Sequence, residues 1–135
     1  MKRIILKIIV AAIVLLIFNL LATYIIIWFF PNIAEEYYNP VFSIEKYKAT
    51  LYFVHPLLVS TALAWFWLRF KILFHGSFWL RGLEVGLAYG AIAVLPSMWL
   101  IFCALSVSLD IVLSWLLYGI IQGIVVGIIY AKINP

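Results

Sequence analysis

The sequence predicts an all-α integral membrane protein, a bundle of four transmembrane helices in a single domain spanning 1–135. Of its 135 residues, 68% are hydrophobic and only 10% are charged, and the mean hydropathy is +1.21. Soluble domains are nearer half apolar and a quarter charged, so a water-soluble globule is excluded. A spanning helix needs roughly 20 mostly apolar residues. Four such spans use nearly the whole stretch, which leaves no room for a soluble catalytic domain.

The first span is expected over about 4–30, where a basic start leads into a long apolar run that Pro31 closes. A basic start followed by apolar residues is also typical of a secretory signal peptide. The apolar run continues through 25–30, however, and the region 20–22 offers no small-residue cleavage site. We therefore expect a retained anchor helix.

The remaining elements follow from breaks in hydropathy. Residues 31–47 form a polar loop with two prolines and several aromatic residues, which suits the headgroup layer on the outer side. The next elements are a second span at about 48–70, an inner loop at 71–77, a third span at about 78–105 and a fourth at about 109–131. Pro56 is expected to bend the second span, because it removes a helix hydrogen bond and frees the carbonyl of Tyr52.

Charge placement predicts that both termini are cytoplasmic. With that orientation, seven of the nine Lys and Arg residues lie on the inner side and four of the five acidic residues on the outer side. This bias in short loops is the positive-inside pattern of multi-pass proteins in a plasma or bacterial inner membrane. The six tryptophans support it, because helix rise puts all of them near an interface. The basic residues form no stripe, so no nucleic-acid partner is expected.

Glycines repeat at every fourth position in the last two spans, and such stripes let backbones approach closely in lipid. The two candidate glycine zippers are Gly82, Gly86 and Gly90 in the third span, and Gly119, Gly123 and Gly127 in the fourth. Depth counted from Arg81 and Lys132 predicts a hairpin with Gly86 opposite Gly127 and Gly90 opposite Gly123. Alternatively, a stripe binds a second copy or another membrane protein, or its glycines are merely tolerated in the membrane.

Four polar residues fall near the bilayer centre on ordinary helix rise: Asn19, Ser60, Thr61 and Gln122. One interpretation is a set of hydrogen bonds between helices. The other is a constriction in a solute or ion path, lined by Asn19 and Gln122.

Two further polar sites lie nearer the membrane surfaces. Glu84 follows Arg81 by three residues, so it forms a rim ion pair or, alternatively, a proton- or cation-binding carboxylate near Tyr130. Asp110 suits the first turn of a helix capped by Ser108; alternatively it pairs with His55 as a pH-responsive gate.

No catalytic, cofactor-binding or metal-binding set is evident. Cys103 is the only cysteine, and no two candidate metal ligands share a helix face at i+3 or i+4. The histidines His55 and His75 are expected at opposite membrane surfaces, which does not suit a haem. We therefore expect a non-enzymatic scaffold or accessory subunit that self-associates or docks another membrane protein through its glycine grooves. The alternative is a small oligomeric transporter or channel that uses the polar layer. Membrane lipid is a partner in either case.

Overall fold

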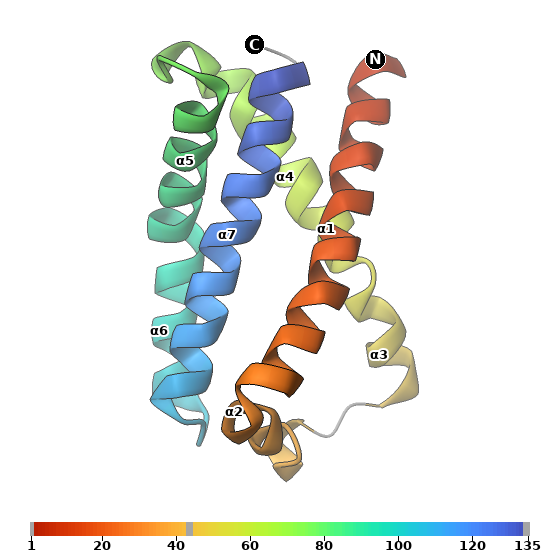
Figure 1. Ribbon diagram of the computed structural model, residues 1–135, viewed down its shortest axis with the longest axis vertical. Coiled ribbons are helices and arrows are strands. Elements are labelled where there is room, and N and C mark those ends of the chain that lie inside the picture. The colour runs from red at the N-terminus through yellow and green to blue at the C-terminus, as the bar shows by residue number, and fades with distance from the viewer. Residues whose placement is uncertain (1, 43–44, 134–135) are drawn as a thin grey trace.

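The computed structural model describes residues 2–42 and 45–133, and this part of the chain is helical without β-strands (Figure 1). Four helical stretches are long and apolar enough to cross a membrane, as expected for an all-α protein with four spans. The helices of the described chain are α1 Lys2–Phe29, α2 Pro31–Glu36, η1 Pro40–Phe42, α3 Lys46–Tyr52, α4 His55–Phe70, η2 Lys71–Leu73, α5 Phe78–Tyr89, η3 Gly90–Val94, α6 Leu95–Ala104 and α7 Leu109–Ile133. Of these, η1 and η2 are 3₁₀-helices and η3 is a π-helix.

Helix α7 is the centre of the bundle. It packs along α5 more extensively than any other two helices pack, and it also contacts α1, α4 and α6. Figure 1 shows α5 and α6 on one side of α7, and α1 on the other with α4 behind. The start of α1 and the end of α7 lie at one end of the bundle, and α2 lies at the other end.

The core is narrow, because each outer helix buries only one stripe. The stripe of α1 is Ala11, Leu15 and Asn19, whose four-residue spacing keeps them on one face. The other core residues come from α4, α5 and α7 and include Trp67, which is 1% exposed and stacks on Phe74 at 5.9 Å between ring centroids. Trp67 is therefore a core residue, and not the interfacial anchor that its sequence position predicts.

Proline explains two of the helix breaks. Phe30 leaves the helical region, with φ −131° and ψ 61°, because the ring of Pro31 clashes with a helical preceding residue. In the second span, α3 ends at Tyr52 and α4 begins at His55, with Pro56 in its first turn. No residue of α3 is buried. The second span is therefore interrupted at 53–54, directly before Pro56, where a bend was expected.

The third span contains a feature that the sequence analysis did not predict, the π-helix η3 between α5 and α6. Pro96 follows it in the first turn of α6 and has no N–H to donate to the carbonyl of Ile92. A π-turn before the proline is one way in which a helix accommodates that missing donor.

A tight turn joins α4 to α5. Gly76 has φ +98°, the left-handed conformation that glycine adopts without steric cost, and it is the one described residue with positive φ. Ser77 then caps α5, since its hydroxyl accepts a hydrogen bond from Leu80 N at 3.4 Å. This turn brings the ends of α4 and α5 to the same end of the bundle.

Candidate functional site

Gln122 joins α7 to α1 through a buried hydrogen bond. Its Nε2 donates to Asn19 Oδ1 at 3.1 Å and lies 3.0 Å from the Tyr118 hydroxyl oxygen, which also accepts. Gln122 is 2% exposed and Asn19 is 4% exposed. Tyr118 in turn stacks on Phe18, with ring centroids 5.4 Å apart. Two of the four residues of the expected polar layer are therefore bonded directly to each other.

Ser60 belongs to a second cluster, nearer the end of the bundle where the chain termini lie. Its hydroxyl donates to the carbonyl of Ile8 at 2.8 Å, and the Tyr130 hydroxyl donates to the carbonyl of Ser60 at 2.8 Å. The two hydroxyl oxygens are 3.0 Å apart. This cluster connects α1, α4 and α7. Sequence reasoning missed Tyr130 as the partner of Ser60, although Tyr130 follows Gln122 by eight residues and so shares its face.

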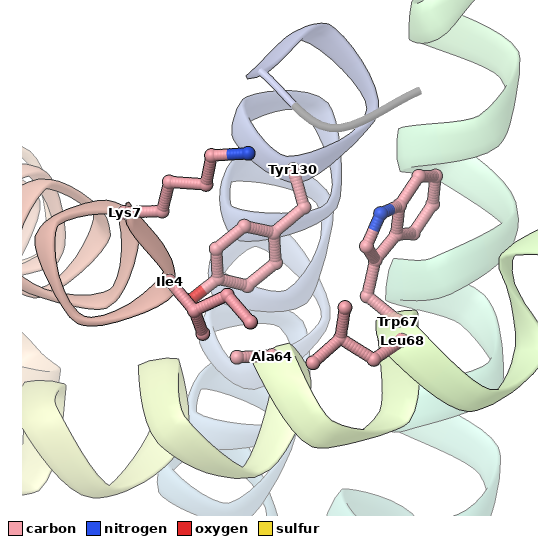
Figure 2. A pocket seen from close by; sticks show the side chains of 6 residues that line it. All are labelled: Ile4, Lys7, Ala64, Trp67, Leu68 and Tyr130. Carbon is pink, nitrogen blue, oxygen red and sulfur yellow. The ribbon is translucent and has the colours of Figure 1, made fainter. Parts of the chain in front are cut away.

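A cavity of about 10 Å³ lies beside Tyr130, between α1, α4 and α7 (Figure 2). Its lining includes Ile4, Lys7 and Ala64, and Figure 2 shows Tyr130 directed between α1 and α4. A volume of this size holds at most about one water molecule. Lys7, which lines the cavity, also bonds to the end of α7, because its Nζ donates to the carbonyl of Ile133 at 3.1 Å. A cation at the last carbonyls of α7 also complements the helix dipole.

Thr61 and Glu84 do not join either cluster. Thr61 is exposed, and its hydroxyl donates to the carbonyl of Leu57 on its own helix at 2.7 Å. The ion pair expected between Glu84 and Arg81 does not form in the described structure. Glu84 Oε2 and Arg81 Nε are both buried without a hydrogen-bond partner. The hydroxyl of Tyr130 bonds to Ser60 rather than to Glu84.

At the other end of the bundle, Ser108 hydrogen-bonds to both α7 and α2. Its hydroxyl accepts from Ile111 N at 3.2 Å, which is the expected helix cap, and donates to Glu36 Oε1 at 2.8 Å. No hydrogen bond or ion pair in the described structure joins His55 to Asp110. The contact with Glu36, from α2, was not anticipated, because loop residues have no periodicity that reports their position.

Tyr37 and Trp115 form a second contact at this end. Trp115 Nε1 donates to the Tyr37 hydroxyl at 2.6 Å, and Phe42 packs edge-on against Trp115 with ring centroids 5.9 Å apart. Burial raises the pKa of Tyr37 above its ordinary value of 10.0, and the hydrogen bond from Trp115 opposes this rise. The loop after α1 is thus attached to the start of α7.

All six glycines of the two stripes are buried, and each faces a residue of the opposite helical segment. A Cβ placed on Gly127 would lie 3.0 Å from Gly82 Cα, and one on Gly123 would lie 3.0 Å from Gly86 Cα. The observed register therefore differs from the expected one by one glycine. Gly90 faces Ile120 instead.

The expected register was wrong because it assumed that Arg81 and Lys132 lie at equal depth. Lys132 Nζ instead lies 5.8 Å from the ring centroid of Phe78, three residues before Arg81. A lysine reaches the membrane surface with its long side chain, so its Cα is a poor marker of depth.

The described residues contain no group of three or more His, Cys, Asp or Glu side chains that would hold a metal ion. Comparisons with protein families, with curated proteins and with solved structures found no match to this chain.

Proposed function

We propose that this protein is a non-enzymatic scaffold or accessory subunit of a cell membrane, a prefolded helical unit that associates with a second copy or with another membrane protein. The observation that supports the proposal is the bonding of the buried polar side chains. Asn19, Gln122, Ser60 and Tyr130 each hydrogen-bond to a group on another helix. Groups bonded in this way stabilise helix association and are not free to coordinate a passing solute.

The glycines contribute to folding of the unit itself in this proposal. Because the two stripes face each other, we propose that they form a zipper that holds α5 against α7 within one chain. A partner then contacts the lipid-facing surface and not the glycine grooves.

The proposed orientation has both termini cytoplasmic. Its support is the excess of Lys and Arg at the end of the bundle where α1 begins, α4 meets α5 and α7 ends (Figure 1).

A second candidate, a small oligomeric channel or transporter, is favoured by one observation. Glu84 Oε2 is buried without a hydrogen-bond partner. An unpaired carboxylate in a membrane segment costs folding free energy, which makes such a residue a candidate for a function in transport. In that case Glu84 binds a proton or cation on the path of transport.

Ion flux into liposomes, read together with the mass of the detergent-solubilised complex, separates the two candidates. We expect liposomes containing the purified protein to take up protons or K⁺ no faster than empty liposomes. We also expect Glu84→Gln to leave the mass of the complex unchanged. Flux through the unaltered protein that Glu84→Gln abolishes, with the complex still assembled, contradicts the scaffold proposal.

A further inference from the structure

An apolar groove of about 220 Å³ runs between α4 and the α5–η3 segment. Both segments pack on α7 but scarcely on each other, which leaves the groove between them. The residues that matter for its shape are Ala62, Trp65 and Phe66 on one wall, and Ala88, Ile92 and Ala93 on the other. Alanines lie on both walls, and two of its residues, Ile92 and Ala93, belong to the π-helix.

One arginine lies at the same end of each wall. Arg69 follows Phe66 by three residues and Ala62 by seven, and these spacings put it on the groove face of α4. Arg81 precedes Ala88 by seven residues, which puts it on the groove face of α5. Since α4 ends and α5 begins at this end of the bundle, the two guanidinium groups mark one end of one groove.

Neither arginine forms an ion pair with a carboxylate in the described structure. Arg81 Nε is buried and has no hydrogen-bond partner. The guanidinium of Arg69 lies 5.9 Å from the ring centroid of Trp65, a cation–π contact that leaves its charge uncompensated. The ion pair that joins Lys48 to Glu45 lies at the start of α3 and involves neither arginine. Glu84, three residues after Arg81, lies on the same face of α5, but its Oε2 has no hydrogen-bond partner. With two guanidinium groups and one carboxylate, this end of the groove keeps a net positive charge.

The depth of the groove matches one leaflet of a bilayer. At about 1.5 Å per residue, Ala88 lies about 10 Å from Arg81 along the helix and Ala93 about 18 Å. Half of a hydrocarbon core about 30 Å thick is about 15 Å. The apolar part of the groove thus lies where the distal part of an acyl chain would be, if its headgroup were level with the arginines.

We propose that the groove binds one acyl chain of an anionic phospholipid whose phosphate is held by Arg69 and Arg81. Guanidinium groups suit phosphate because they donate two parallel hydrogen bonds. A second copy of this chain suits the groove less well, because two-fold packing in a membrane would bring the arginines of both copies together. The proposal requires only that the chain spans a membrane and does not depend on the scaffold function; the proposed orientation assigns the lipid to the inner leaflet.

Native mass spectrometry of the purified protein tests this, with dioleoyl phosphatidylglycerol and dioleoyl phosphatidylcholine added at equal concentration. We expect the singly lipidated protein to carry mostly phosphatidylglycerol. Each of Arg69→Gln and Arg81→Gln should weaken that preference about fivefold, since a basic residue near an anionic surface contributes about 1 kcal/mol. The control pair Lys46→Gln and Lys48→Gln removes equal charge at the opposite end and should leave the preference unchanged.

The groove itself is tested by filling it. Ala88→Phe should reduce phosphatidylglycerol binding at least fivefold, whereas Ala91→Phe, at an exposed neighbour that does not line the groove, should leave it unchanged. Ala62→Leu provides a second, milder filling from the other wall, with thermal unfolding to confirm that each variant is folded. Equal binding of the two lipids overturns the proposal, and so does phosphatidylglycerol binding that survives both fillings. A dimer that Ala88→Phe dissociates into monomers overturns it in favour of a second copy.

Discussion

The substitution Gly86→Ala tests the contact between α5 and α7 most sharply. A methyl carbon at this position would lie 2.6 Å from the backbone nitrogen of Ile124 and 3.0 Å from the carbonyl oxygen of Ile120. Backbone atoms of a helix cannot rotate away as side-chain atoms can. The whole of α7 must therefore shift to admit one methyl group.

The same substitution at Gly90 is the matched control. There the three nearest atoms to the added carbon all belong to the side chain of Ile120, which has other rotamers available. Alanine gains up to about 1 kcal/mol over glycine in a helix, while overpacking costs typically 1–3 kcal/mol. We expect Gly86→Ala to lower the free energy of unfolding by about 1–2 kcal/mol, and Gly90→Ala to change it by less than about 1 kcal/mol.

The free energy of unfolding of both variants is measured by titration with sodium dodecyl sulfate in mixed micelles, with circular dichroism as the readout. The reasoning is refuted if Gly86→Ala is as stable as the unaltered protein, or if Gly90→Ala is the more damaging of the two. Either result would mean that α5 and α7 do not meet at backbone distance.

Three further predictions concern polar contacts. Tyr130→Phe removes the hydroxyl that bonds α7 to α4 and should lower the free energy of unfolding by about 0.6–1.7 kcal/mol in the same detergent titration. A double-mutant cycle of Asn19→Leu and Gln122→Leu should give a coupling energy of similar size, and a coupling energy near zero would show that the two side chains are not bonded. Because burial raises the pKa of Tyr37 above 10.0, its protonated form stabilises the fold below pH 10 and this contribution is lost as pH rises through the higher folded-state pKa. Stability measured from pH 8 to 12 should therefore fall less steeply in Tyr37→Phe than in the unaltered protein.

The helical class and the approximate spans could be predicted because the membrane imposes them. An apolar run of more than 20 residues has few alternatives to a spanning helix. Pro31 and Pro56 each lie in the first turn of a new helix, a position that proline favours after the preceding helix has ended. The bonding of Asn19 to Gln122 also follows from this constraint, since polar groups at one depth in lipid satisfy each other.

The details of register and side-chain direction could not be predicted in this way. Ser60 and Thr61 are adjacent in sequence, yet one is fully buried and the other faces outward, because helix rotation is set by packing. The register of α5 against α7, which differs from the expected one by one glycine, has a similar origin. Lys132 was expected at the depth of Arg81, but its side chain lies over Phe78, three residues before Arg81. The contact of Glu36 with Ser108 depends on the path of a loop, about which hydropathy carries no information.

Cysteine accessibility in intact cells tests the central claim, that the chain crosses a membrane four times with both ends on one side. In a Cys103→Ser background, single cysteines replace Lys46, Asp110, His75 or Lys132, and each is exposed to a thiol reagent that cannot cross the membrane. We predict labelling of Lys46→Cys and Asp110→Cys from outside, and labelling of His75→Cys and Lys132→Cys only after the cells are opened. Labelling of Lys46→Cys and Lys132→Cys from the same side would contradict the account.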